Sequence, residues 1–389
     1  MKSIVILTAT RAEYGLLSPI IHALKKIGKY SVKVVATGAH LSPEFGLTYR
    51  EIEGDGIVID KKIEILLSAD TPSSISKSMG LAMIGFADYF ADSRPDALIV
   101  LGDRYETLAV CCAAMNECIP IIHLYGGETT QGAVDEAVRH AITKLSYLHL
   151  TSTEEYRKRV IQLGESPDRV FNVGAIGVEN ALKTKLLSRG DLEKAIGCKL
   201  DKPYAVVTFH PVTLESNSAE LQCEELLRAL SQYRNMQFLI TKANADSNGR
   251  IINTMLEKYA FEHENVQVYD SLGSTKYLSA LKYAAMVIGN SSSGLVEVPS
   301  FNIPTINIGD RQKGRLKADS VIDCLPEENA ICEAMRCAMT DEFRRVCKKN
   351  SNPYGDGEAT SKIVAAVDWM LANEINLKKG FYDLEVQDD

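Results

Sequence analysis

Short runs rich in Val, Ile and Leu alternate with longer amphipathic segments along this chain. Continuous apolar runs of this kind are typical of parallel strands that helices cover on both faces. The segments between them, such as residues 15–30, repeat their apolar positions with the spacing of a helix. The alternation therefore predicts an α/β protein with doubly wound parallel sheets. The predicted strands are residues 3–9, 31–38, 97–103, 119–125, 148–153, 169–174, 204–210, 236–241, 266–270, 286–291 and 304–310.

A charged segment in the middle of the chain marks the expected domain boundary, near residues 177–202. It ends in Lys-Pro directly before a new predicted strand. The chain has 389 residues, which is long for one domain and sufficient for two. We therefore expect a Rossmann-like N-terminal domain at 1–185 and a Rossmann-like C-terminal domain at 186–359, with a cleft between them. The amphipathic helix predicted near the C-terminus could pack on either one.

The composition narrows the function classes without identifying one. Hydrophobic residues make up 46% of the chain and charged residues 24%, which is ordinary for a globular protein. A net charge of -8 argues against a nucleic-acid partner, although a small anionic ligand needs only a local positive patch. We expect a cytoplasmic protein without a membrane partner, because we find neither a membrane-spanning run nor a signal peptide in the sequence. The nine cysteines form no CxxC pair and predict free thiols.

Polar residues that follow predicted strands are the first candidates for a site, because open α/β sheets bind ligands at the carboxyl ends of their strands. Each of them also has a structural interpretation. Asp103 could simply cap the next helix, and His210 could be a packed histidine. The candidates selected in this way are Arg11, His40, Asp103, His210 and Arg311.

The segment GNSSSG, residues 289–294, is a stronger candidate. It lies between a predicted strand and a predicted helix, so its backbone N–H groups and hydroxyls could face an anion with help from the helix dipole. Glu297, just inside that helix, could accept hydrogen bonds from ribose hydroxyls. Phosphate donors beside a sugar acceptor predict a nucleotide site, whereas the structural alternative is an ordinary Ser/Gly turn.

The stretch HLYGGETTQGAVDEAVRHA, residues 123–141, permits three interpretations. Its adjacent glycines could cradle phosphate, but its carboxylates Glu128, Asp135 and Glu136 would repel it and favour acid/base chemistry. Asp135 could also cap the following helix. His140 suits a structural role, and His123 stays ambiguous.

Several cofactor and catalytic motifs are missing from the sequence. The seven histidines show no HxxxH or HxH spacing, which argues against a metal site. We find no GxGxxG after the first strand, no Walker A motif and no GxSxG elbow. We therefore expect neither a metal nor a cofactor.

Seven motifs taken together resemble the hydrolysing UDP-N-acetylglucosamine 2-epimerases of bacterial sialic acid biosynthesis. They are TATRAEYGLLSPII, TGAHLSPEFG, VLGDRYE, HLYGGE, DEAVRHAITKLS, FHPVT and IGNSSSGLVEVPSFNIPTINIGDRQKGR. The resemblance runs from residue 2 to about residue 370. It implies a GT-B-like fold with the nucleotide sugar in the cleft: sugar and carboxylates on the N-terminal domain, UDP on the C-terminal domain. It also implies that the last helix, within 360–389, returns to the N-terminal domain.

The resemblance implies a reaction as well. UDP-GlcNAc and water would give UDP and N-acetylmannosamine, the first step of sialic acid synthesis. The C2 proton is removed as UDP leaves, a 2-acetamidoglucal forms, and water then adds. This chemistry demands no metal or redox cofactor. The family also suggests a homodimer or homotetramer, with the UDP-sugar as small-molecule partner.

The resemblance assigns roles residue by residue. Asp103 and Asp135 match essential carboxylates, and His210 matches an active-site histidine that acts as an acid or a phosphate ligand. The residues matched to substrate binding are Arg11 for the diphosphate, Ser291 and Ser292 for phosphate, Gly294 in the same loop, Glu297 for ribose, Arg311 as a cleft arginine and His40 in a substrate-side loop.

One position departs from the commoner family pattern HIEGGE, in which a catalytic glutamate lies two residues after the histidine. Here that position is Tyr125, and we hypothesise that Glu128 takes over part of its work. Alternatives remain open: a related UDP-diacetamido sugar of legionaminic acid synthesis as substrate, a non-hydrolysing epimerase, a GT-B glycosyltransferase, or a non-catalytic nucleotide-sugar sensor.

Overall fold

The computed structural model describes residues 1–389 except 70, 131–133, 213–217, 244–248 and 386–389. Contacts divide the chain into two compact units. Unit 1 comprises Met1–Glu128, Asp135–Ile176 and Glu358–Asp389, and unit 2 comprises Thr129–Val134 and Gly177–Gly357. The division thus falls before the 185/186 boundary that we expected from the sequence. Whether the units are independent folding domains stays a prediction.

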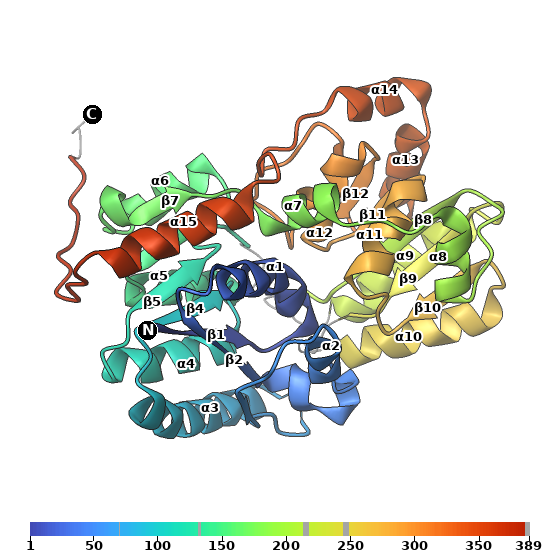
Figure 1. The fold of residues 1–389 in the computed structure, drawn as a ribbon. Coiled ribbons are helices and arrows are strands. Elements are labelled where there is room, and N and C mark those ends of the chain that lie inside the picture. Colours follow the sequence, from blue (N-terminus) through green and yellow to red (C-terminus); the bar gives the residue numbers. More distant parts are fainter. Residues whose placement is uncertain (70, 131–133, 213–217, 244–248, 386–389) are drawn as a thin grey trace. The chain divides into compact units, whose positions relative to one another are not determined.

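Unit 1 is built on a seven-stranded parallel sheet in the order β3-β2-β1-β4-β5-β6-β7 (Figure 1). Its strands are β1 (Ser3–Thr8), β2 (Ser31–Thr37), β3 (Lys61–Ile63), β4 (Ala97–Leu101), β5 (Ile121–Leu124), β6 (Leu148–Thr151) and β7 (Val170–Asn172). Its helices are α1 (Arg11–Ile27), α2 (Tyr49–Gly54), α3 (Pro72–Ser93), α4 (Tyr105–Asn116), α5 (Asp135–Leu145), α6 (Glu154–Gln162) and α15 (Ala359–Ala372). Two buried apolar clusters cover this sheet.

Unit 2 repeats this plan with a six-stranded parallel sheet in the order β10-β9-β8-β11-β12-β13. Its strands are β8 (Tyr204–Thr208), β9 (Gln237–Thr241), β10 (Val266–Tyr269), β11 (Met286–Gly289), β12 (Thr305–Ile308) and β13 (Val321–Cys324). Its helices are α8 (Arg189–Ile196), α9 (Ala219–Ser231), α10 (Gly249–Glu262), α11 (Ser274–Tyr283), α12 (Ser293–Val296), α13 (Glu328–Ala338) and α14 (Asp341–Lys349). Helix α7 (Ile176–Lys183) starts where the chain passes from unit 1 into unit 2.

Every strand predicted from the apolar runs is present, and the α/β class is confirmed. The prediction missed β3 and β13, which are short edge strands. β3 exposes Lys61 and Lys62, and no residue of β13 is fully buried. An edge strand covered on one face lacks the continuous apolar run that identified the others.

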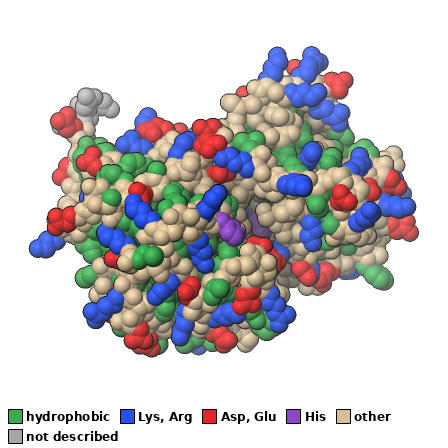
Figure 2. Space-filling model, viewed as in Figure 1, with side chains coloured by type: hydrophobic (Ala, Val, Ile, Leu, Met, Phe, Trp, Pro, Cys, Tyr) green, Lys and Arg blue, Asp and Glu red, His purple; other side chains and the backbone are tan. Residues whose placement is uncertain are grey.

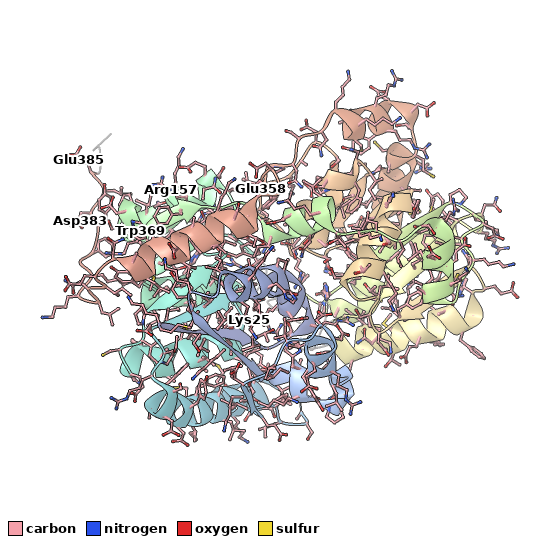
Figure 3. All side chains as sticks on the ribbon, viewed as in Figure 1. Lys25, Arg157, Glu358, Trp369, Asp383 and Glu385 are labelled. Carbon is pink, nitrogen blue, oxygen red and sulfur yellow. The ribbon has the colours of Figure 1, made fainter. Side chains whose placement is uncertain are left out.

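The C-terminal helix α15 packs on α1 and contributes to the core of unit 1. Trp369 of α15, labelled in Figure 3, lies edge-on to Phe171 of β7 with ring centroids 5.4 Å apart. Lys and Arg side chains are interspersed with Asp and Glu over the face shown in Figure 2. Among the helices of the described ranges, none is long and apolar enough to cross a membrane.

The strand order of each sheet reverses direction at one place. In unit 1 the chain moves outward from β1 in one direction through β2 and in the other through β4; in unit 2, β8 is flanked by β9 and β11 in the same way. Loops on either side of such a switch point diverge at the carboxyl ends of the strands and leave space for a ligand. The fold therefore directs attention to the loops after β1 and β4, and after β8 and β11.

Candidate functional site

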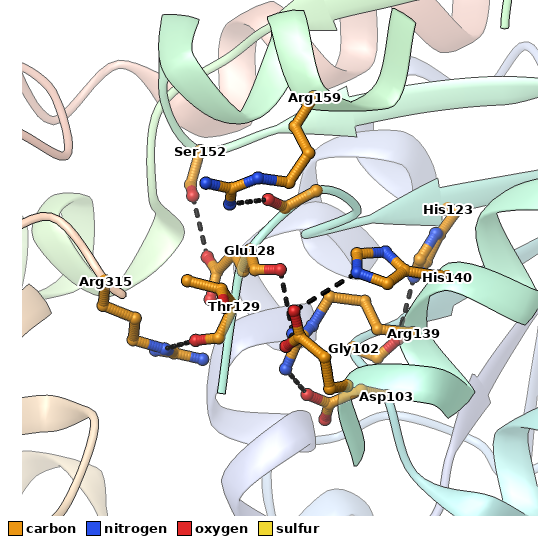
Figure 4. A network of polar contacts seen from close by, with 12 residues as sticks. Gly102, Asp103, His123, Glu128, Thr129, Arg139, His140, Ser152, Arg159 and Arg315 are labelled. Carbon is orange, nitrogen blue, oxygen red and sulfur yellow. Dashed lines mark hydrogen bonds and ion pairs between the residues drawn. The ribbon is translucent and has the colours of Figure 1, made fainter. Parts of the chain in front are cut away.

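In unit 1, a buried arginine organises the loops after β4 and β5 (Figure 4). Arg139, on α5, is 1% exposed. Its Nη2 donates to the carboxylate of Asp103, while its Nη1 donates to Glu136 Oε2 at 2.8 Å and to the backbone oxygen of Glu128 at 2.9 Å. The guanidinium fork thereby fixes two carboxylates and the end of the glycine loop, as its planar set of donors allows.

Asp103 does not cap the helix that follows it. Helix α4 begins at Tyr105, its N-cap is Arg104, and no side chain makes the cap hydrogen bond. The carboxylate of Asp103 instead pairs with Arg139 and keeps a quarter of its side-chain surface exposed. A carboxylate that is oriented by an arginine and still accessible is suited to proton transfer.

Asp135 lies at the first position of α5, so it belongs to the first turn of that helix rather than preceding it as an N-cap. Its neighbour Glu136 makes the described contacts of this turn, to Arg139 and, at 3.3 Å, to His140 Nε2. Arg139 was not among the residues predicted from the sequence, and no role of its own was predicted for Glu136. The available signal was the i,i+3 spacing of an acid and an arginine on a predicted helix.

Glu128 lies at the end of the glycine turn and is 4% exposed. Its Oε1 accepts a hydrogen bond of 2.7 Å from Ser152 Oγ, which follows β6. Gly127, with φ 77°, cannot be replaced here without a clash, because a Cβ would lie 2.3 Å from the backbone oxygen of Tyr156. The glycine at this position thus permits close packing on α6 rather than the cradling of an anion.

Two histidines near the carboxyl ends of the unit 1 strands are buried and uncharged. His123 Nε2 lies 2.8 Å from the backbone oxygen of Gly102, and burial lowers the pKa of His123 to about 3. His40 lies 2.9 Å from Thr8 Oγ1 through Nε2 and 2.8 Å from Thr48 Oγ1 through Nδ1, and burial lowers its pKa to about 4. His40 has no exposed surface, so these contacts support a role in positioning the loops. Direct substrate contact by His40 stays a prediction.

Arg11 begins α1 at the carboxyl end of β1. Its side chain is 30% exposed, and its Nη1 lies 3.5 Å from Glu51 Oε1. A partly exposed guanidinium on the first turn of a helix is placed to meet an anionic ligand. The assignment of Arg11 to a diphosphate stays a prediction.

In unit 2, Asn290 joins the loops after β8 and β11. Its Oδ1 accepts from the backbone N–H of His210 at 2.7 Å, and its Nδ2 donates to the backbone oxygen of His210 at 2.8 Å. Gly289, with φ 134°, lets these strands approach, since a Cβ there would lie 1.9 Å from the backbone oxygen of Thr208. The switch point of unit 2 thus holds His210, which is 5% exposed, beside the serine loop.

The serine loop leads into a helix shorter than predicted. Helix α12 has only four residues and is followed by a 3-10 turn at Val298–Phe301, with Pro299 in its first turn. Proline lacks the N–H that would continue an α-helix, which explains the early end. The expected contribution of a helix dipole is therefore small, and anion binding at Ser291 and Ser292 would rest mainly on local N–H and O–H donors.

Other contacts fix the geometry of this loop. The backbone oxygen of Gly294 accepts from Thr305 Oγ1 at 2.8 Å, and a Cβ on Gly294 would lie 2.8 Å from Thr305 Cγ2. Arg311 Nη1 donates to the backbone oxygen of Asn290 at 3.2 Å. Glu297 directly follows α12 instead of lying inside a longer helix. The predicted nucleotide-binding residues of unit 2 therefore gather around the carboxyl ends of β8, β11 and β12.

The candidate residues of the two units suit different chemistry. Unit 1 offers two partly exposed carboxylates held by an arginine and a buried carboxylate held by a serine, which suits the transfer of a proton. Unit 2 offers hydroxyls, backbone N–H groups and an arginine, which suit phosphate, and a carboxylate, which suits a diol. Among the described residues, no group of His, Cys, Asp and Glu side chains could hold a metal ion.

Comparison with known proteins gives consistent matches. A family model described as UDP-N-acetylglucosamine 2-epimerase matches residues 22–368. The chain is 44% identical over 384 residues to the GDP/UDP-N,N'-diacetylbacillosamine 2-epimerase (hydrolyzing) of Campylobacter jejuni, which covers 98% of this chain and 99% of that one. It is 42% identical to the polysialic acid biosynthesis protein P7 of Escherichia coli, covering 99% and 98% of the two chains. It is 34% identical to the UDP-N,N'-diacetylbacillosamine 2-epimerase (hydrolyzing) of Legionella pneumophila, covering 93% and 94%.

Among solved structures, the chain resembles a UDP-GlcNAc 2-epimerase from Neisseria meningitidis bound to UDP-GlcNAc. The TM-score is 0.80 at 20% identity, and the match covers 96% of this chain and all of the other. At this level of identity the likeness concerns the fold alone. It confirms the predicted α/β, GT-B-like fold.

Proposed function

This chain belongs to the UDP-N-acetylglucosamine 2-epimerase family, and we propose that it is a hydrolysing member that releases a free, 2-epimerised amino sugar from a nucleotide diphosphate sugar. The observation that carries the proposal is the 44% identity, over 98% of the chain, to a hydrolysing 2-epimerase. The Asp103–Arg139 pair after β4 and the serine loop after β11 supply the matching chemistry.

For the substrate we propose a nucleotide-linked N,N'-diacetylbacillosamine, a diacetamido sugar. Two of the relatives described above carry this sugar in their names, at 44% and 34% identity. The sequence-based preference for UDP-GlcNAc is therefore less well supported than the diacetamido alternative. UDP-GlcNAc remains the second candidate because of the 42% identity to a polysialic acid biosynthesis protein.

The proposed reaction has two steps. A carboxylate removes the C2 proton, the electrons of the C–H bond form a C1–C2 double bond, and the C1–O bond breaks so that the nucleoside diphosphate leaves with its electron pair. Water then adds its oxygen to C1 and gives up a proton to a base, while C2 takes a proton on the opposite face. Acids and bases on both faces of the ring are therefore needed, and donors must stabilise the departing diphosphate.

The candidate residues divide between these tasks. Asp103, oriented by Arg139, and Asp135, at the start of α5, are the proposed base and acid at C2. The proposed diphosphate ligands are Arg11, His210, Ser291, Ser292 and Arg311, with Gly294 allowing close approach and Glu297 binding ribose.

In the commoner family pattern a catalytic glutamate lies at position 125. We propose that Glu128 takes over part of its role here. Ser152 orients its buried carboxylate. We expect Glu128→Gln, which keeps the acceptor for Ser152, to lower turnover about 10²-fold, the size of a missing acid/base group. Full turnover in a variant with a native circular dichroism spectrum would remove Glu128 from the mechanism.

The reaction is tested by NMR in D₂O with three substrates: UDP-N,N'-diacetylbacillosamine, its GDP counterpart and UDP-GlcNAc. We expect a free 2-epimerised diacetamido sugar with deuterium at C2, together with free UDP or GDP. A product still attached to its nucleotide would show a non-hydrolysing enzyme. Turnover of UDP-GlcNAc alone would favour the second candidate substrate, and Asp103→Asn serves as the inactive control.

A further inference from the structure

Tyr125 occupies an unusual backbone conformation directly after β5. Its φ is 71°, in the left-handed region that bulky side chains rarely adopt. Its backbone N–H donates to the backbone oxygen of Leu150 at 2.9 Å, so the residue is still held by β6. A conformation of this kind is strained and persists only where its surroundings enforce it.

The hydroxyl of Tyr125 accepts a hydrogen bond of 2.7 Å from the backbone N–H of Ile176, the first residue of α7. The first N–H groups of a helix have no partner within the helix and need an external acceptor. A side chain from a turn 51 residues earlier supplies it here. Tyr125 thus fixes the point at which α7 begins.

The next residue, Gly177, begins the second part of unit 2 and lies against Glu297. A Cβ built on Gly177 would lie 2.2 Å from Glu297 Oε1 and 2.8 Å from its Cδ. A side chain at this position would therefore require the carboxylate of Glu297 to shift. The first turn of α7 thus lies directly against the carboxylate of Glu297.

From these contacts we infer that Tyr125 is a positioning residue: it sets the first turn of α7, and through Gly177 it sets the carboxylate of Glu297. The inference rests on the proposed function, in which Glu297 binds the ribose of a nucleotide. It gives a structural role to the position where this chain departs from the commoner family pattern. The hydroxyl acts on nucleotide binding through α7, without reacting with the sugar itself.

Binding of UDP and of GDP, measured by isothermal titration calorimetry, tests the inference without depending on turnover. We expect Tyr125→Phe, which removes only the hydroxyl, to weaken binding of the preferred nucleotide about fivefold, the effect of one hydrogen bond. Tyr233→Phe is the matched control, because its hydroxyl also bonds to one backbone group, the oxygen of Cys332, away from the site. The control should bind as wild type does.

A double-mutant comparison separates this role from a general loss of stability. If Tyr125 acts through Glu297, the variant Tyr125→Phe/Glu297→Gln should bind no more weakly than Glu297→Gln alone. A full additional fivefold loss in the double variant would overturn the inference, as would unchanged binding by Tyr125→Phe.

A second substitution tests the contact between Gly177 and Glu297 directly. Gly177→Ala should weaken nucleotide binding at least tenfold because its Cβ displaces the carboxylate, whereas Gly190→Ala, in α8 with open space around it, should have no effect. Wild-type affinity in Gly177→Ala would overturn this inference but leave the proposed function intact. Failure of the wild-type protein to bind either nucleotide would overturn the proposed function and this inference with it.

Discussion

The unit 1 sheet has a carboxyl-end edge, where its strands end, and an amino-end edge, where its strands begin. Each of these edges contains a buried carboxylate, and the pKa values of the two carboxylates are shifted in opposite directions. Glu13 lies at the carboxyl-end edge, in the first turn of α1, where burial and the nearby charge of Glu106 raise its pKa to about 7. Glu165 lies at the amino-end edge, before β7. Burial alone would raise its pKa, but His149, Lys144 and Lys379 outweigh burial and lower it to about 2.

The difference lies in how much positive charge each edge supplies. Lys379 reaches both carboxylate oxygens of Glu165 at 2.9 Å, and Lys144 reaches one at 2.6 Å. Glu13 instead accepts only backbone N–H groups, from Ala9 and Thr10. The amino-end edge is thus neutralised locally, as in a structural ion-pair cluster. At the carboxyl-end edge the nearby cation, Arg104, pairs with Glu106 at 2.7 Å, and Glu13 keeps a raised pKa, as titratable groups of functional sites often do.

Helix α5 serves both edges, and this allows the comparison to be tested within one element. Arg139 near its start orients Asp103, and Lys144 near its end pairs with Glu165. We expect Arg139→Lys to lower turnover about 10²-fold, because an ammonium cannot replace the planar fork and a small misplacement of an acid/base group is costly. Release of nucleoside diphosphate in a coupled assay measures this.

The matched control is Lys144→Arg, which keeps the charge beside Glu165 at the other edge. We expect its turnover to stay within twofold of wild type. If Arg139→Lys were as active as Lys144→Arg, the carboxyl-end edge would have no special role in catalysis.

The pH dependence of stability should distinguish the two carboxylates. An unfolded glutamate loses its proton near pH 4.5, whereas folded Glu13 keeps its proton to about pH 7. The folded state therefore binds more protons between these values, and stability falls as the pH rises through them, by at most about 3 kcal/mol. Urea unfolding of wild type at pH 5 and pH 8 should show this fall.

Glu13→Gln should abolish most of that fall, since its amide oxygen can still accept from Ala9 and Thr10 but cannot ionise. The charges of Glu106 and Arg104 act on the same group, so Glu106→Gln is the companion variant. An equal loss of stability in wild type and Glu13→Gln would assign the pH dependence to other groups.

The sequence predicted the scaffold better than the details of the site. Continuous apolar runs identified the buried parallel strands. The residues that follow these strands then identified Asp103 and the serine loop as candidates. The contact between Arg139 and Asp103 was not predicted, because the two residues follow different strands and meet only in the folded structure. The short length of α12 was within reach of the sequence, since Pro299 follows so soon after residues 289–294.

His40 shows the limit in the other direction. Its place after a strand suggested a binding residue in a substrate-side loop, and its two ring nitrogens hydrogen-bond with Thr8 and Thr48, on separate segments. Local sequence does not reveal which distant groups will meet a side chain. The tertiary contacts of a residue such as His40 are therefore beyond what sequence reasoning can predict.

The smallest effect is expected at the amino-end edge, from the C-terminal segment. Lys379→Met removes two contacts to Glu165 and one of 2.6 Å to the backbone oxygen of Ser146, while Lys144 and His149 still hold the carboxylate. We expect unfolding to become easier by about 1.5 kcal/mol, the lower value for hydrogen bonds to charged groups, with unchanged turnover. Lys378→Met, at an exposed neighbouring position, should change stability by less than about 0.5 kcal/mol.

The same variant tests the sign of the titration at this edge. The stability from the lowered pKa of Glu165 is present above about pH 4.5 and is lost as the pH falls towards about 2, so wild type should lose stability in acid. With Lys379 removed, the pKa of Glu165 moves back towards its ordinary value, and the acid loss should shrink. A reduced turnover in Lys379→Met at neutral pH would show that the two edges are coupled, and that the amino-end cluster is more than a structural support.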